Sequence, residues 1–207
     1  MILNQHSVVY LLLGLLSLLL IAFTYYKNKR ENALILLLGM IGLSHIIEFV
    51  ILVLFDSYTY IPLIILHNPY YDSVMGALFS NSFALPATAM FIAVFQLSGV
   101  WVILFAGLFT CIEWLFVQLN VYEHHWWKYG YTTLGLFTYF AVAKAWHRYL
   151  QFPLRPHHQF FTLFFCLTGA VLMVEGLPLL FFESRFYELD WLDRKSTRLN
   201  SSHTQKS

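Results

Sequence analysis

Long apolar segments follow one another along most of the chain, and short polar segments separate them. A membrane-spanning helix needs about 20 predominantly apolar residues to cross the hydrocarbon layer. The apolar stretch from Leu78 to Val121 is about twice that length, and Leu97-Ser98-Gly99 is the best place for a turn inside it. The pattern therefore predicts six spans, at residues 8–26, 33–55, 78–97, 100–121, 129–150 and 159–182.

Residues 56–77, between the second and third predicted spans, have a different composition. This connection is rich in Tyr, contains Pro62 and Pro69, and includes a short apolar piece, Ile61–Leu66. Six residues are too few to cross a bilayer, whereas Tyr is enriched at the membrane–water interface. We therefore expect an interfacial or re-entrant segment here.

The composition supports the same fold class. Hydrophobic residues make up 59% of the chain and charged residues only 11%, which is outside the usual range of soluble proteins. The charges also cluster between the apolar blocks and do not form charged helix faces. We expect an all-α fold, a polytopic membrane helix bundle in which residues 1–192 form one domain and the lipid bilayer is the surrounding partner.

Residues 193–207 need separate treatment. The stretch from Asp193 to His203 reads as one frame of a common sequencing-library adapter, so we interpret 193–207 as a non-native tail and expect the natural chain to continue differently after Leu192. Of 12 basic and 11 acidic residues, four basic and one acidic lie in this tail, which leaves residues 1–192 with a formal net charge of −2. The formal charge of +1 of the whole chain is therefore no indication of a nucleic-acid partner.

The basic residues predict an orientation in the membrane. Loops that must share one side carry six Lys or Arg residues, and the opposite side carries two. Cytoplasmic loops have an excess of Lys and Arg, so the N-terminus is predicted outside. The six are Lys27, Lys29, Arg30, Lys144, Arg148 and Arg155, and the two are Lys128 and Arg185.

Polar residues inside the predicted spans are the candidates for chemistry. Glu48, Glu113 and Glu175 each lie seven or eight residues before the outer end of a span, which places all three about 10–12 Å below the outer boundary. His45 is one helical turn from Glu48 on the same face. The proposed polar cluster, a candidate site for a cation or proton, is His45, Glu48, Asn81, Ser82, Glu113 and Glu175.

Three carboxylates at one depth without a Lys or Arg cannot all be ionised without a large free-energy penalty. One interpretation is structural: each carboxyl group is neutral and forms a hydrogen bond with a neighbouring helix. A second is a pathway or site for a proton or cation. A third is a catalytic or metal site, because the set is rich in oxygen and includes one imidazole. The pattern identifies no cofactor.

Two histidine pairs, His124-His125 and His157-His158, invite comparison with the histidine boxes of membrane oxygenases. Such boxes need several histidines on one side of the membrane, whereas the predicted topology places these pairs on opposite sides. We therefore interpret them as interfacial residues. The segment Trp126-Trp127-Lys128 is typical of an aromatic belt with a snorkelling cation.

Four features in a fixed order resemble those of a known family. They are Asn68-Pro69-Tyr70-Tyr71-Asp72, Leu85-Pro86-Ala87-Thr88-Ala89, Glu113 and Trp126-Trp127-Lys128-Tyr129. Together they resemble an uncharacterised family of small multi-pass membrane proteins of endospore-forming bacteria, over about residues 40–150; His124-His125 departs from the Lys-rich sequence expected there. The resemblance implies a multi-pass protein of the bacterial cytoplasmic membrane and no particular reaction.

These observations lead to three hypotheses about function. The first is a non-enzymatic transporter-like or sensor protein with a protonatable or cation-binding cavity in its outer half. The second is a membrane-embedded, metal-dependent enzyme that uses Glu113 together with His45 and Glu48. The third is a structural subunit of a membrane complex, whose protein partners the sequence does not identify.

Overall fold

A computed structural model describes residues 4–28, 31–66, 68–153 and 155–182 of the 207-residue chain. The described part is a helical bundle with one small β-ribbon, which confirms the predicted all-α class; the tail at residues 193–207 lies outside it. The elements are α1 (Gln5–Asn28), α2 (Glu31–Glu48), η1 (Phe49–Leu54), β1 (Tyr58–Tyr60), α3 (Pro69–Leu78), η2 (Phe79–Ala84), α4 (Leu85–Val94), α5 (Gly99–Gln118), β2 (Tyr122–His124), α6 (Tyr129–Leu150) and α7 (Pro156–Phe182).

Among the described residues, five helices are long and apolar enough to cross a membrane. They cover Gln5–Asn28, Asn32–Leu54, Pro69–Val94, Gly99–Gln118 and Pro156–Gly176. The sixth predicted span coincides with α6, which has 22 residues but is less apolar and ends with His147 and Arg148 in its last turn. The chain thus has the helices of an integral membrane protein, with α6 as the least apolar of the six predicted spans.

The third long helix begins at Pro69, nine residues before the predicted span, so part of the expected interfacial connection is helical. The reason is a local N-cap: the Asn68 side chain accepts hydrogen bonds from the amides of Tyr70 (3.1 Å) and Tyr71 (3.2 Å). Proline at the first helical position has no amide hydrogen to leave unpaired, and its backbone angle suits a helix. Asn68-Pro69 therefore marks the start of this helix.

The rest of that connection is held against α3 by a buried carboxylate. Asp72 is 4% exposed and accepts hydrogen bonds from three successive amides, those of Leu63, Ile64 and Ile65, at 2.9, 2.8 and 2.9 Å. These bonds fix a turn in which Leu63 has a φ of 51°. The turn directs the chain from the β-ribbon into α3.

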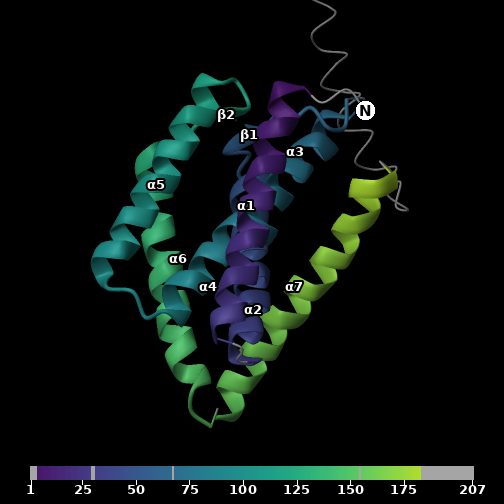
Figure 1. The fold of residues 1–207 in the computed structure, drawn as a ribbon. Coiled ribbons are helices and arrows are strands. Elements are labelled where there is room, and N and C mark those ends of the chain that lie inside the picture. The colour runs from purple at the N-terminus through teal and green to yellow at the C-terminus, as the bar shows by residue number, and fades with distance from the viewer. Residues whose placement is uncertain (1–3, 29–30, 67, 154, 183–207) are drawn as a thin grey trace, which may run out of the picture.

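The β-ribbon joins two segments that are more than 60 residues apart in sequence. Strands β1 and β2 pair antiparallel, with Tyr58 opposite His124, Thr59 opposite Glu123 and Tyr60 opposite Tyr122. The ribbon lies at the same end of the bundle as the start of α1 (Figure 1), because the Tyr10 hydroxyl donates to the Val121 carbonyl at 2.7 Å. This ribbon covers one end of the helices.

Helix α2 packs most closely against α7, and glycines make this approach possible. A Cβ atom at Gly42 would overlap the backbone carbonyl of Phe165, and one at Gly169 would overlap the carbonyl of Leu38. Helix α5 lies on the other side of the bundle from α7 (Figure 1). This arrangement separates Glu113 on α5 from Glu175 on α7.

Two π-helical segments widen the helices near the ribbon. In η1, for example, the amide of Phe55 bonds to the carbonyl of Val50, five residues earlier, at 3.1 Å. Segment η1 begins directly after Glu48, and η2 contains Asn81 and Ser82. Such π segments often occur at functional sites. Here they adjoin three of the predicted site residues.

Candidate functional site

Glu48, at the end of α2, is a buried carboxylate held by the ribbon. Its Oε2 accepts a hydrogen bond of 2.8 Å from the hydroxyl of Tyr58 in β1, and its side chain is only 8% exposed. Its other oxygen, Oε1, is buried and has no hydrogen-bond partner. Tyr60 and Asn81 also lie near this carboxylate, but without hydrogen-bond geometry to Oε1. Glu48 thus retains one unused acceptor.

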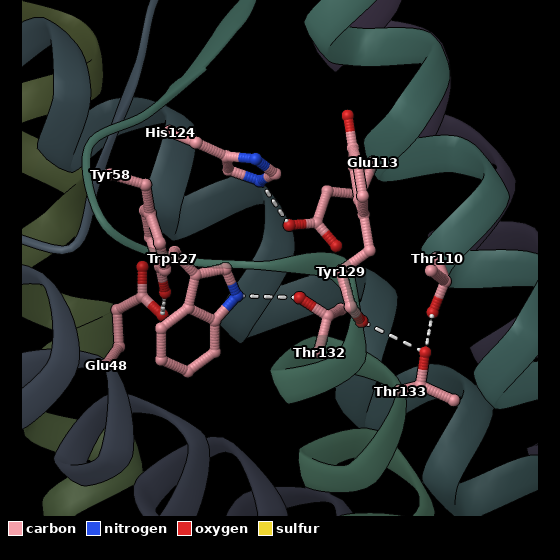
Figure 2. Close-up of polar contacts among 9 residues, drawn as sticks. All are labelled: Glu48, Tyr58, Thr110, Glu113, His124, Trp127, Tyr129, Thr132 and Thr133. Atoms are coloured by element: carbon pink, nitrogen blue, oxygen red, sulfur yellow. Dashed lines mark hydrogen bonds and ion pairs between the residues drawn. The ribbon is translucent and has the colours of Figure 1, made fainter.

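Glu113, in the last two turns of α5, repeats this arrangement. His124 Nε2 in β2 and Glu113 Oε1 lie 2.6 Å apart (Figure 2), and Glu113 is 9% exposed. Its Oε2 is likewise buried and without a hydrogen-bond partner. Because His124 is itself mostly buried, with 16% of its side chain exposed, water has little access to the pair. Both carboxylates therefore have one bonded oxygen and one unpartnered one.

The ribbon explains why the two carboxylates form one site. Tyr58 and His124 are directly opposite each other in the ladder. The side chains of opposite residues in an antiparallel pair lie on the same face, with Cβ atoms about 4.5–5.5 Å apart. One of these neighbours bonds to Glu48 and the other to Glu113. The ribbon thereby links a carboxylate on α2 to one on α5 through two neighbouring side chains, Tyr58 and His124 (Figure 2).

Both carboxylates line a cavity of about 720 Å³ beneath the ribbon. Its walls come mainly from α2, α5, α6 and the ribbon, with smaller parts from α1, η1, η2 and α4, and they are mainly apolar. Among the lining residues in the described part of the chain there is no Lys or Arg. The apolar walls include Leu43, Ile47, Ile51, Phe109, Ile112, Leu134, Leu136 and Val142.

Aromatic side chains surround the carboxylate end of the cavity. The ring centroids of Tyr58 lie 5.1 Å from Tyr122 and 5.6 Å from Trp127, and Tyr60 lies 5.0 Å from Tyr122. Burial raises the pKa of Tyr58 well above its ordinary value, and the nearby carboxylate of Glu48 raises it further. Burial also raises the pKa of Tyr60 and Tyr122. These phenols therefore stay neutral, and Tyr58 serves Glu48 as a hydrogen-bond donor.

The structure brings together part of the predicted polar cluster. Asn81 lines the same cavity as Glu48 and Glu113. His45 Nε2 lies 2.8 Å from the hydroxyl of Ser82, a contact between α2 and η2. Ser82 lines a second, apolar cavity of about 310 Å³ between α1, η2 and α7.

Glu175 is exposed on α7 and is not among the residues that line the larger cavity. Three glutamates at equal depth along their helices can lie on different helix faces, so depth alone does not predict that they meet. The site in the structure is thus a pair of carboxylates on α2 and α5, with α7 on another side of the bundle.

Sequence reasoning missed the two side chains that hold the carboxylates. His124 was interpreted as an interfacial histidine, but it binds Glu113, and Tyr58 was placed in the interfacial connection, but it binds Glu48. Trp127, expected in an aromatic belt, lines the cavity and donates from Nε1 to Thr132 at 2.7 Å (Figure 2). Trp126 is 48% exposed. Burial varies along Tyr122–His124 as in a strand, but three residues are too few for a strand to be identified from the sequence.

Within the described ranges, no group of three or more His, Cys, Asp or Glu side chains is placed to hold a metal ion. The fold and the site define a class, a helical bundle with membrane-spanning helices and a buried dicarboxylate cavity. Comparisons with known protein families, with curated proteins and with solved structures found no match to this chain.

Proposed function

We propose that this chain is a multi-pass membrane protein of the transporter-like or sensor type whose cavity binds exchangeable positive charge, as a proton or a cation, at Glu48 and Glu113. The observation that supports the proposal is a pair of buried carboxylates, Glu48 and Glu113, that line one cavity and each have one oxygen without a hydrogen-bond partner.

Electrostatics gives the physical reason. A buried acceptor without a partner destabilises a protein by about 1–3 kcal/mol, and by more when it is charged. Two carboxylates that share a low-dielectric cavity also repel each other. A proton or a bound cation removes both penalties, and no Lys or Arg among the described lining residues does so instead. His124 neutralises Glu113 only when its ring is protonated, and Glu48 has no such partner, so the pair favours positive charge from outside the chain.

The orientation proposed for the membrane places this cavity near the outer surface of a bacterial cytoplasmic membrane. The ribbon and the start of α1 are at one end of the bundle, where His6 Nδ1 lies 3.0 Å from the carbonyl of Ile61. The basic residues Lys27 and Arg148 are at the ends of α1 and α6, which lie at the opposite end. The charge distribution supports an N-terminus outside.

Infrared spectroscopy of the carboxyl groups tests the proposal. The full chain, labelled with ¹³C at Glu carboxyl groups and held in lipid nanodiscs, is titrated with acid, and the C=O band of protonated carboxylic acid is followed. The ionisable neighbours of the pair are Tyr58, Tyr60, Tyr122 and His124, and the raised pKa of the three phenols keeps them neutral.

We expect Glu48→Gln and Glu113→Gln each to remove a component of this band that Glu175→Gln leaves in place. The matched control is Glu175→Gln, which removes an exposed glutamate at a similar position along its helix. The proposal fails if the three variants lose the same band, because then the two cavity glutamates hold protons no differently from a surface carboxyl group.

A further inference from the structure

We infer that the cation is an amphiphilic primary ammonium, a protonated amine on an apolar chain, which reaches the cavity from the bilayer side. This inference rests on the proposed function, since it names the ligand of the same carboxylate pair. Four features of the cavity carry it: its size, its distribution of polar groups, its lack of basic residues and its opening.

The size of the cavity exceeds what a proton or a bare inorganic ion requires. Its volume is about 720 Å³, and one water molecule occupies roughly 30 Å³ in the liquid. Small-molecule sites in proteins typically have about 300–1,000 Å³, mostly apolar walls and a few placed polar groups. The cavity therefore has the size and lining of a site for an organic molecule.

The polar groups gather where they suit an ammonium group. An ammonium has three N–H donors and no acceptor, and the cavity lining includes two carboxylates, Glu48 and Glu113, each with one oxygen that has no hydrogen-bond partner. The rings of Tyr58, Tyr122 and Trp127 are next to these carboxylates, and aromatic faces attract cations. An ammonium can both donate to a carboxylate and balance its charge, which a neutral alcohol or an anion cannot do.

The remaining walls suit an apolar chain. Away from the ribbon the lining consists of side chains such as Leu43, Phe109, Leu136 and Val142. Burial of each methylene group there contributes about 0.8 kcal/mol. No Lys or Arg is present among the described lining residues, so a phosphate next to the amine would meet only carboxylates. This favours a free amphiphilic amine over a phospholipid headgroup.

The exposed lining residues point to an opening between α2 and α6. The hydroxyl of Tyr139 on α6 donates to the carbonyl of Met40 on α2 at 2.9 Å and joins the two helices. Nearer the ribbon, Ile47 on α2 and Leu134 on α6 line the cavity, yet they are 41% and 67% exposed. The cavity thus reaches the surface beside exposed apolar side chains on two helices. An amphiphile in the membrane can enter by this side without crossing the polar end.

Binding of tritiated dodecylammonium to the full chain in phosphatidylglycerol nanodiscs tests the inference. Empty nanodiscs correct for partition into lipid, and dodecanol, dodecyl sulfate and methylammonium serve as competitors. We expect saturable binding that the other three compounds do not displace. We expect Glu48→Gln and Glu113→Gln to weaken it about tenfold or more, because each removes a charged acceptor, and Glu175→Gln to leave it unchanged.

A second variant tests the opening and does not alter the carboxylates. Leu134→Trp places a larger side chain at the exposed edge of the cavity, and we expect a slower association rate with the acid titration of the carboxyl band unchanged. Circular dichroism and gel filtration confirm that each variant is folded. An association rate equal to that of the wild type excludes the proposed side opening.

Four outcomes would overturn the ligand class. Displacement by dodecanol indicates simple apolar partition, and equal affinity for methylammonium makes the apolar chain irrelevant. Loss of dodecylammonium binding when phosphatidylethanolamine replaces phosphatidylglycerol indicates that a lipid headgroup is the true ligand. If none of the amphiphiles binds but the carboxyl band still depends on Glu48 and Glu113, only the ligand class fails; if that band is also independent of them, the proposed function fails too.

Discussion

Replacing Tyr58 by Phe removes one hydrogen bond and leaves the aromatic packing of the ribbon in place. The Tyr58 hydroxyl donates to Glu48 Oε2 at 2.8 Å, and both residues are buried. Since Glu48 Oε1 already has no partner, the substitution leaves a buried carboxylate with two unsatisfied oxygens. A hydrogen bond to a charged group contributes about 1.5–3 kcal/mol, so we expect a loss of stability of that size.

Tyr122→Phe is the matched control. Tyr122 is also on the ribbon, is 6% exposed and has a ring centroid 5.1 Å from that of Tyr58. Thermal unfolding in nanodiscs is the assay. For a chain of this length about 1 kcal/mol corresponds to roughly 2–4 °C in Tm, so Tyr58→Phe is expected to lower Tm by about 3–12 °C and Tyr122→Phe by much less.

A double-mutant cycle then assigns the effect to the contact. If the hydroxyl acts through Glu48, Tyr58→Phe has a much smaller effect in the background of Glu48→Gln, because a neutral amide is less destabilised by the loss of a donor. The reasoning is refuted if Tyr58→Phe and Tyr122→Phe have equal effects, or if the effect of Tyr58→Phe is the same with and without the Glu48 carboxylate.

Three further substitutions test other contacts of the fold and the site. His124→Phe removes the partner of Glu113 and is expected to lower stability by about 1.5–3 kcal/mol, measured by thermal unfolding; a change in Tm no larger than that of an exposed histidine variant would contradict the pairing. Gly42→Ala places a methyl group on the α7 backbone and is expected to destabilise by about 1–3 kcal/mol. Gly107→Ala, with nothing near its Cβ position, should be neutral or stabilise by up to about 1 kcal/mol, and equal Tm values for these two glycine variants would refute the close helix approach. Asp72→Ala leaves three amides without their acceptor and is expected to cost about 1–3 kcal/mol, with proteolysis of the loop as a second measurement; unchanged cleavage would exclude this role.

The helices of this protein could be predicted because membrane-spanning segments need a fixed apolar length. The prediction for α6, residues 129–150, agrees with the observed bounds, and the break at Leu97-Ser98-Gly99 separates α4 from α5. The start of the third long helix was wrong by nine residues. The first turn of that helix is polar, with Tyr70, Tyr71 and Asp72, so a search for apolar segments leaves it out of the predicted span. Asn68 and Pro69 are nevertheless ordinary helix-start residues.

The candidate site was predictable only in part, because the depth of a residue along its helix and the side of the helix on which its side chain lies are different properties. Depth follows from counting residues along a helix, and of the three glutamates Glu48 and Glu113 are buried in the bundle. Which side of a helix faces its neighbours depends on how the helices pack. Here α7 packs against α2 at Gly42, and α5 lies on a different side of α2. For this reason Glu175 was grouped with the other two on depth alone.

The partners of the carboxylates could not be derived from local sequence at all. Tyr58 and His124 become neighbours through the pairing of two three-residue strands, which has no local pattern strong enough to identify it. Yet this pairing makes the site, because it joins the end of α2 to the end of α5. A buried carboxylate on one helix is tolerable as an isolated structural group. Here two carboxylates are held by adjacent side chains, line the same cavity and each keep one oxygen without a partner, and on this arrangement we base the proposal of an exchangeable positive charge.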